Sequence, residues 1–233
     1  MPHNAHVVQS NCHNAAVYIQ PSAANRKPTR KKIGSNTGTL IDPFRRREIY
    51  YESNLERDHI LVWIANPDVL EIQEQYRVEY LCNGAVKEHF VDVLVTFKDG
   101  SRFAYFIKYD RQLYSSGIRG QIQAIVAGCS DDFADELRIL TENHVDEMAI
   151  SNAKLIVNAG RQFDEDATCI VRAALSSAPA VVTPRQIGRD TGLGRRGEDA
   201  FIALLQSGAV SISQNRQITA DAPFNNLLTP VTT

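Results

Sequence analysis

Four charged side chains in the first half of the chain are of the types that hold a metal ion and hydrolyse a phosphodiester. Glu52 and Glu56 lie four residues apart in an amphipathic segment, so they point from one face of the helix expected there. Asp92 and Lys108 each lie in a hydrophobic run. Carboxylates bind Mg²⁺, the ion activates water, and a lysine stabilises charge at the attacked phosphate. These residue types therefore indicate metal-dependent phosphodiester hydrolysis.

Each of these residues also has a purely structural explanation. A charge buried in a strand costs on the order of several kcal/mol unless it is paired, hydrogen-bonded or bound to a metal. Metal ligation is the sharpest explanation for Asp92, and a structural ion pair between Asp92 and Lys108 is the alternative. Glu52 and Glu56 are equally consistent with a solvated acidic edge of a helix. Residue types and spacing alone leave both interpretations open.

Hydrophobic periodicity predicts the elements that would position these side chains. Asn83-Gly84 is a strong signal for a β-hairpin, and Asn66-Pro67 ends the first helix. The predicted elements are a helix at 52–64, strands at 75–82, 88–97 and 102–108, a helix at 117–127, a strand at 137–141 and a helix at 151–158. The first three strands form an antiparallel meander. Strands mixed with flanking helices indicate an α/β core.

Helices predominate beyond about residue 145. The predicted helices are 164–176, 184–190 and 195–206, followed by a β-like segment at 209–213. Thr183-Pro184 is a cap followed by proline at the first helical position. Two short helices around Thr191-Gly-Leu-Gly194 suggest a helix-turn-helix with a small wing. Its basic rim would comprise Arg185, Arg189, Arg195 and Arg196, of which Arg195 and Arg196 are expected to contact DNA. A helical bundle used for protein contact explains the pattern equally well.

Composition places the chain among ordinary globular proteins. Its 233 residues are 43% hydrophobic and 22% charged, enough for one large core or two small ones, and we expect two domains. No run of about eighteen apolar residues occurs, and the start lacks the pattern of a secretory signal. Neither a membrane nor export is indicated, so a bacterial or phage cytoplasm is the expected setting.

Positive charge is concentrated near the amino terminus. Residues 1–50 hold eight Lys or Arg against Asp42 and Glu48, although the whole chain has a net charge of −2. Residues 1–25 lack periodicity and are expected to be a disordered tail. Residues 26–47 are expected to form an arm that clasps DNA, in which Gly34-Ser-Asn-Thr-Gly38 is extended or looped; a solubilising segment is the alternative. The arm's cations expected on phosphates are Arg30, Lys31, Lys32, Arg45, Arg46 and Arg47.

Six short motifs resemble, in order and spacing, the TnsA family of transposon endonucleases. They are Arg30-Lys-Lys-Ile-Gly-Ser-Asn-Thr-Gly38, Tyr51-Glu-Ser-Asn-Leu-Glu-Arg-Asp58, Asn66-Pro-Asp-Val69, Gln73-Glu-Gln75, His89-Phe-Val-Asp-Val-Leu-Val95 and Phe106-Ile-Lys108. The resemblance covers about residues 28–215. It implies a restriction-endonuclease-like mixed sheet flanked by helices, of the PD-(D/E)xK type, and a mainly helical winged-helix carboxy-terminal domain. The expected units are thus a tail at 1–25, a nuclease domain with its basic arm at 26–145, and a winged-helix domain at 146–233.

The resemblance also implies an activity, a cofactor and partners. Members of the family cut double-stranded DNA at the 5′ ends of a transposon. A partner DDE transposase (TnsB) cuts and joins the 3′ ends, and an ATPase regulator (TnsC) binds TnsA. Mg²⁺, or Mn²⁺ in its place, is the implied cofactor, and the implied location is at the nucleoid. Glu56, Asp92 and Lys108 match the catalytic glutamate, aspartate and lysine, and Gln75 matches a family glutamine outside the metal set.

One departure from the family bears on the chemistry. The family has Glu or Gln two residues before the lysine, whereas this chain has Phe106, which cannot coordinate a metal. Val91 replaces the usual proline, which affects the turn more than the chemistry. Three interpretations are open. Glu52 or Asp110 supplies the missing ligand; metal binds weakly and cleavage is slow; or the domain no longer cuts and serves as a scaffold for DNA, transposase and regulator.

Overall fold

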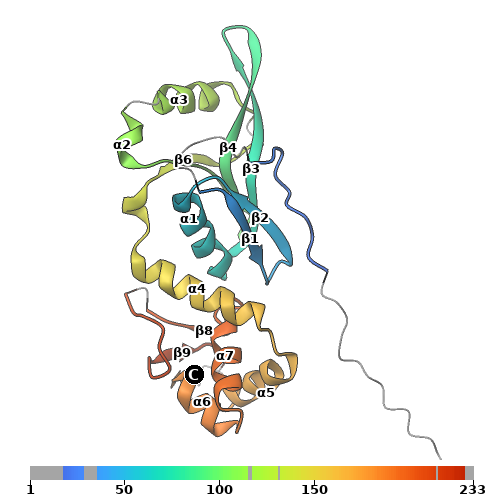
Figure 1. Cartoon of the computed structure of the whole chain (residues 1–233), viewed down its shortest axis with the longest axis vertical. Coiled ribbons are helices and arrows are strands. Elements are labelled where there is room, and N and C mark those ends of the chain that lie inside the picture. Colours follow the sequence, from blue (N-terminus) through green and yellow to red (C-terminus); the bar gives the residue numbers. More distant parts are fainter. Residues whose placement is uncertain (1–17, 29–35, 115–116, 131, 214, 229–233) are drawn as a thin grey trace, which may run out of the picture.

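The computed structural model describes most of the chain (Figure 1). The described ranges are 18–28, 36–114, 117–130, 132–213 and 215–228. Three of the expected DNA-binding residues, Arg30, Lys31 and Lys32, lie outside these ranges, as does most of the expected tail. None of the helices within the described ranges combines the length and apolar character needed to cross a membrane.

A four-stranded mixed sheet forms the centre of the amino-terminal lobe. Its strands, in spatial order, are β3 (Val69–Cys82), β4 (Ala85–Phe97), β5 (Arg102–Ile107) and β6 (Glu136–Leu140). β3, β4 and β5 pair in antiparallel fashion, and β6 runs parallel to β5. The expected α/β class, mixed sheet and antiparallel meander are confirmed.

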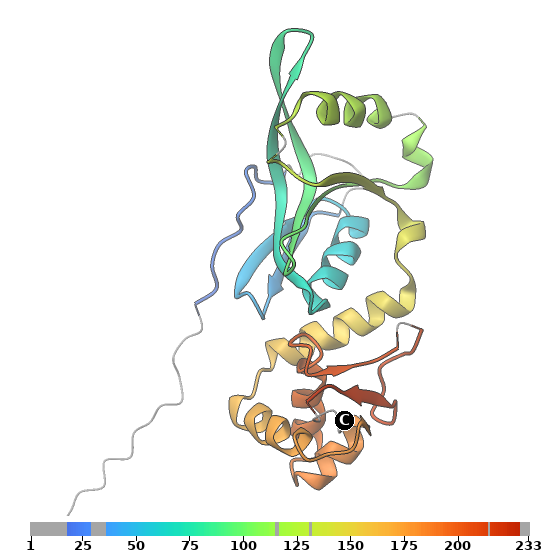
Figure 2. The same ribbon diagram turned by 180° about the vertical axis from the view of Figure 1, so that it is seen from behind.

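The hairpin of β3 and β4 is longer than predicted. Asn83 and Gly84 form its turn with φ values of 53° and 76°, and Cys82 pairs with Ala85 across it. Positive φ at both turn residues matches the right-handed twist of the strands, which explains why Asn-Gly is favoured there. Both views show the tip projecting beyond the rest of the lobe (Figures 1 and 2).

Helices cover both faces of this sheet. The helices and the short 3₁₀ turn of this part of the chain are α1 (Asn54–Ala65), α2 (Asp110–Leu113), α3 (Ile118–Gly128), η1 (Glu142–His144) and α4 (Glu147–Arg161). α1 packs on one face, where Ile60 and Ile64 join the same buried cluster as Val93 and Ile107 of the sheet. α3 covers the other face with a second cluster that includes Val78, Tyr80, Val91, Leu94, Ala104, Phe106, Ile118 and Ile125.

The segment expected to be a basic arm contains a second hairpin. Strands β1 (Gly38–Asp42) and β2 (Arg47–Tyr51) pair in antiparallel fashion. The Asp42 carboxylate closes their turn by accepting hydrogen bonds from the backbone N–H groups of Phe44 and Arg45, each at 3.0 Å. The sequence analysis did not predict these two strands, because the turn between them depends on hydrogen bonds to the Asp42 side chain.

Residues 18–25 also differ from the disordered tail expected over 1–25. Together with residues 26–28, they run beside β2 and β3 in both views (Figures 1 and 2). Gln20 donates its backbone N–H to the Arg46 carbonyl at 2.7 Å, and its own carbonyl accepts from the Glu48 N–H at 2.9 Å. This segment thus continues the hydrogen bonding of the fold.

The carboxy-terminal lobe follows α4. Its elements are α5 (Glu165–Leu175), β7 (Val181–Val182), α6 (Pro184–Asp190), α7 (Arg195–Ala203), β8 (Val210–Ser211) and β9 (Phe224–Asn226). The three short strands form an antiparallel sheet in the order β7-β9-β8. α6 and α7 approach closely at Gly188, where an added Cβ would lie 2.6 Å from the Gly194 carbonyl oxygen. Buried side chains from both lobes form one continuous cluster, to which α4 contributes Ala153 and Val157.

Candidate functional site

Asp92 lies where strands β4 and β5 part. Their pairing runs from Thr96 to Val93 on β4 and does not extend to Asp92. Instead, Asp92 Oδ2 accepts hydrogen bonds from the backbone N–H of Ile107 at 2.7 Å and from Lys108 Nζ at 2.8 Å. The carboxylate therefore takes over a strand donor that the sheet no longer satisfies, and it is held in one orientation.

Strand β3 changes geometry opposite this point. The register passes from Glu74 opposite Val93 to Tyr76 opposite Val91, which leaves Gln75 beside Asp92 without a regular pair. Gln75 has φ 49°, an uncommon conformation for a residue with a side chain. As a result, Glu74 and Gln75 are both fully buried although they are consecutive in a strand. Local distortion of this kind is frequent at functional sites.

The Glu56 carboxylate is fixed at the start of α1. Ser53 caps the helix: its Oγ accepts from the Glu56 backbone N–H at 3.1 Å and donates to Glu56 Oε1 at 3.1 Å. The backbone N–H of Glu52 donates to Glu56 Oε2 at 2.8 Å. This reciprocal arrangement resembles a capping box, so Glu56 also has a structural role.

The environment of Glu56 links it electrostatically to the strand residues. Burial, and then the nearby Asp92 carboxylate, raise the pKa of Glu56 to about 7, although the Glu52 N–H and Lys108 oppose the shift. Burial lowers the pKa of Lys108, but Asp92, Glu56 and Glu52 outweigh it, so the ammonium stays charged. The three predicted catalytic residues, together with Glu52, are thus brought together.

Phe106 packs on the α3 face of the sheet. It is fully buried and stacks on the His89 ring, with the ring centroids 5.4 Å apart. Burial lowers the pKa of His89, while Asp92 raises it and Lys108 and Arg26 lower it further, so this imidazole lies within electrostatic range of the site. Sequence reasoning missed His89; its place three residues before Asp92 in a quoted motif was the available signal.

Asp110, the second candidate for a replacement ligand, lies elsewhere. It begins α2, and its backbone N–H donates to the Glu142 carboxylate at 2.9 Å. The charges that shift the pKa of Glu56 and Lys108 include Asp92 and, for Lys108, Glu52, but not Asp110. Of the two candidates, the structure brings Glu52 to the site.

Arg26 is a second residue of the site; the sequence placed it in the basic arm but not beside the predicted catalytic residues. Its Nε donates to Gln75 Oε1 at 2.8 Å, and its Nη2 contacts Glu52 Oε2 at 3.0 Å. The guanidinium carbon lies 5.3 Å from the centroid of the Phe90 ring. These partners lie far away in the sequence, so no local pattern could reveal the arrangement.

Two carboxylates define what metal this site could hold. Among the described residues, no group of three or more His, Cys, Asp or Glu side chains forms a metal-binding cluster. Glu56 and Asp92 provide hard oxygen donors, and their mutual repulsion, visible in the raised pKa of Glu56, is what a cation would relieve. This donor set fits a single Mg²⁺ ion that keeps several waters, as magnesium commonly does.

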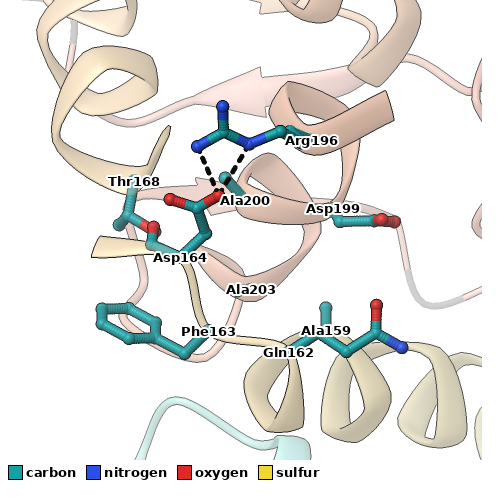
Figure 3. A pocket seen from close by; sticks show the side chains of 9 residues that line it. All are labelled: Ala159, Gln162, Phe163, Asp164, Thr168, Arg196, Asp199, Ala200 and Ala203. Carbon is teal, nitrogen blue, oxygen red and sulfur yellow. Dashed lines mark hydrogen bonds and ion pairs between the residues drawn. The ribbon is translucent and has the colours of Figure 1, made fainter. Parts of the chain in front are cut away.

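The remaining residues expected on DNA divide into two groups. Arg45 and Arg47 have partners within the fold: Arg45 donates to Asp42 at 2.8 Å and to the Leu70 carbonyl at 2.9 Å, and Arg47 contacts Glu74 at 3.2 Å. This differs from the phosphate contacts expected of them. Three are exposed. They are Arg46, Arg195 and Arg196. Arg46 lies at the hairpin turn, and Arg195 lies 3.2 Å from Asp199. Arg196 lies 2.7 Å from Asp164, beside a small pocket (Figure 3).

Comparison with known proteins adds no assignment to this geometry. Neither protein-family models nor curated proteins give a match to the sequence.

Proposed function

We propose that this chain is the endonuclease subunit of a heteromeric transposase, which hydrolyses double-stranded DNA at the 5′ ends of a transposon with Mg²⁺ or Mn²⁺. One observation carries the nuclease proposal. Glu56 of α1, Asp92 of β4 and Lys108 after β5 converge at the place where β4 and β5 part. The transposon and the partners, a DDE transposase and an ATPase regulator, come from the motif resemblance. Bacterial or phage cytoplasm, at the nucleoid, is the setting that this function implies.

The proposed roles follow from the positions of the residues. Glu56 and Asp92 would hold the cation, which when bound supplies Lewis-acid activation of water and charge at the phosphate. Lys108, oriented by Asp92 at 2.8 Å, offers a positive charge to the attacked phosphate or the attacking water. Glu56, with a pKa of about 7, exchanges its proton near neutral pH and must lose it to act as a ligand.

The carboxy-terminal lobe would bind DNA or a protein partner. The chain order α5, β7, α6, α7, β8 and β9, with β9 central in the small sheet, supports the proposal of a winged helix. Its exposed Arg185, Arg195 and Arg196 pair with single surface acids, so they could exchange these partners for phosphates.

Nicking of linear transposon-end DNA, in the presence of the partner transposase and Mg²⁺ or Mn²⁺, tests the proposal. We expect Asp92→Ala and Glu56→Ala to lose 5′-strand nicking while they retain DNA binding. Glu136→Ala is the matched control, because it removes an acid that also pairs with a basic side chain, Arg138, but lies outside the site and the proposed DNA contacts. The enzyme proposal is wrong if the wild-type protein nicks no more than the two site variants.

The second candidate function is a scaffold that binds DNA, transposase and regulator without cutting. It is favoured by the internal partners of the site, since Asp92 and Lys108 satisfy each other and Glu56 caps α1. Titration with Mn²⁺, monitored by isothermal calorimetry, separates the enzyme from the scaffold. An enzyme binds the ion in a way that Asp92→Ala abolishes, whereas a scaffold of this kind shows no Asp92-dependent binding.

A further inference from the structure

We propose that Arg26 is a further phosphate-binding residue of the candidate site, presented by the segment 18–28 docked on β3. The inference rests on the proposed function, because it assigns to Arg26 a contact with the DNA phosphate at the site. It extends that function to the amino-terminal segment, whose docking would be part of assembling the site.

The position of Arg26 is set by its neighbours in the docked segment. The Asn25 backbone N–H donates to the Gln75 carbonyl at 3.3 Å, and Asn25 Oδ1 accepts from the Arg77 N–H at 2.8 Å. Ser22 Oγ donates to the buried Glu74 carboxylate. The hydrogen bonds of Ser22 and Asn25 therefore fix the backbone just before Arg26, opposite the irregular part of β3.

The Arg26 guanidinium is held in one orientation, but not all of its hydrogen-bond donors have an acceptor among the described residues. Gln75 and Glu52 hold its Nε and Nη2, and the Phe90 ring lies beneath it. Its Nη1 has no hydrogen-bond partner among the described residues, and the side chain is 38% exposed. Arg45 is the contrast, since its guanidinium binds Asp42 and backbone carbonyl oxygens and is only 18% exposed. Arg26 thus keeps donors for a ligand.

A second donor beside Arg26 also lacks an acceptor. Gln75 is fully buried, and its Nε2 has no hydrogen-bond partner among the described residues. A buried amide donor that is left unsatisfied is unfavourable and calls for an explanation. Phosphate oxygens accept several hydrogen bonds at once, and the planar fork of an arginine suits their geometry. An anion at Arg26 is the ligand that this pair of donors would take.

The net charge of the site, once a divalent cation is bound, favours an anionic ligand such as a phosphate. Among the residues that the structure describes, two cations, Lys108 and Arg26, face the carboxylates of Glu52, Glu56 and Asp92 when all are ionised. A bound divalent cation would make the cluster positive by one charge, and a single phosphodiester would neutralise it. Without Arg26, the loaded site would already be neutral and would attract the phosphate less.

The test measures binding of a fluorescein-labelled transposon-end duplex over a range of salt concentrations, with Ca²⁺ in place of Mg²⁺. Arg138→Ala is the matched control, because Arg138 also contacts an acid, Glu136 at 2.6 Å, and lies over an aromatic ring, Phe103 at 4.3 Å. For Arg26→Ala we expect the slope of log K against log salt to fall by about one, with little change in Arg138→Ala. Nicking with Mg²⁺ and the transposase should fall by roughly tenfold or more in Arg26→Ala.

The outcomes separate the two proposals. If wild type nicks and Arg26→Ala matches the control in slope and rate, Arg26 is not a phosphate ligand, while the nuclease function stands. If wild type does not nick but the slope falls in Arg26→Ala, the nuclease function fails and the phosphate contact stands. Faster nicking with an unchanged slope also overturns the proposal, since Arg26 would then compete for Glu52. Circular dichroism checks folding. If the alanine variant unfolds, Arg26→Lys, which keeps the charge but not the planar fork, should keep the salt slope and lower the nicking rate, and an unchanged rate would overturn the proposal.

Discussion

Acid–base pairs occur in both lobes at similar distances, but they lie in different surroundings. Lys108 and Asp92 are 2.8 Å apart with side chains 30% and 9% exposed, whereas Arg196 and Asp164 are 2.7 Å apart with side chains 61% and 31% exposed. Water screens the second pair and is largely excluded from the first. The distance between two charges therefore does not reveal their role, and burial is the more informative quantity.

The two regions also differ in how their charges balance. In the amino-terminal lobe, Lys108 is shared by Asp92, Glu56 and Glu52. In the described part of the carboxy-terminal lobe, each arginine that forms an ion pair contacts one acid, as Arg185 contacts Asp221, and Glu198 adds only a weaker electrostatic effect on Arg185. Among the described residues, negative charge thus exceeds positive charge around Lys108, which is the condition for attracting a metal ion. In the ion pairs of the carboxy-terminal lobe, one positive charge faces one negative charge, so each arginine can exchange its acid for another anion.

Phe106→Glu should give the largest change, because the new carboxylate enters the apolar cluster beneath α3. Phe106 is 1% exposed. We expect the free energy of unfolding to fall by about 4 kcal/mol, from lost packing and an unpaired buried acid. Urea unfolding measures this fall. Phe163→Glu is the control in the other lobe, since Phe163 is 58% exposed, and it should change stability by no more than ~0.5 kcal/mol.

The same variant tests whether residue 106 can restore the family pattern. Stability near that of wild type, together with tighter Mn²⁺ binding, would contradict the expected burial and show that the glutamate turns toward Asp92. That result would identify Phe106 as the change that weakens the site. Loss of stability without gain of metal binding would instead agree with Phe106 as part of the core.

The next largest effect should be a dependence of the free energy of unfolding on pH, caused by Glu56. Its pKa is about 7 in the folded protein against an ordinary value of 4.5, so the folded state binds more protons between these values. Its contribution to stability is complete below about pH 4.5 and is lost as the pH rises through about 7. The loss should be about 3 kcal/mol.

Urea unfolding of wild type and Glu56→Gln at about pH 4 and about pH 8 measures this loss. The difference between the two proteins is the informative quantity, because buried His59 and half-buried His89, whose pKa values are lowered by burial, contribute equally to both. A difference that does not vary with pH would mean that burial and the nearby Asp92 carboxylate do not raise the pKa of Glu56. Added Mn²⁺ should reduce the loss if the two carboxylates share the ion.

The sequence predicted those parts of the fold that local signals determine. Helix α6 was predicted with its observed bounds, because Thr183 caps it and Pro184 occupies its first position. The β3–β4 turn followed from Asn83-Gly84. Strands β7 and β9 were missed because they have two and three residues, too few for a periodic pattern. The β1–β2 hairpin was missed because its turn depends on hydrogen bonds to the side chain of Asp42.

The candidate site divides in the same way. Asp92 and Lys108 could be found because a charge inside a hydrophobic run is conspicuous. Arg26 could not, because its partner Gln75 lies 49 residues away and reaches it only through an irregular strand. Sequence patterns thus located charged residues inside hydrophobic runs, such as Asp92 and Lys108. They did not locate Arg26 at the site, because tertiary contacts with distant residues place it there.

Replacing Asp92 by asparagine should have a smaller effect on stability than either change above, although nicking should be lost. It leaves the Lys108 ammonium without its partner, but the Lys108 side chain is 30% exposed and the change also relieves Glu56. We expect the free energy of unfolding to fall by about 2 kcal/mol, less than is typical of fully buried pairs. A double-mutant cycle with Lys108→Met measures the coupling, and a coupling near zero would place this pair with the surface pairs of the other lobe.

Arg196→Ala should give the smallest effect, because its ion pair is screened by water and its partner keeps another role. Asp164 Oδ1 caps α5 by accepting from the Ala167 N–H at 3.0 Å, and this bond does not need Arg196. Thermal unfolding should shift by less than about 2 °C, and added salt should remove even that difference. Affinity for DNA should fall nonetheless if the lobe contacts phosphates through this arginine. A large loss of stability that persists in salt would show instead that Arg196 and Asp164 are coupled as strongly as Lys108 and Asp92, and burial would then not be what separates the two regions.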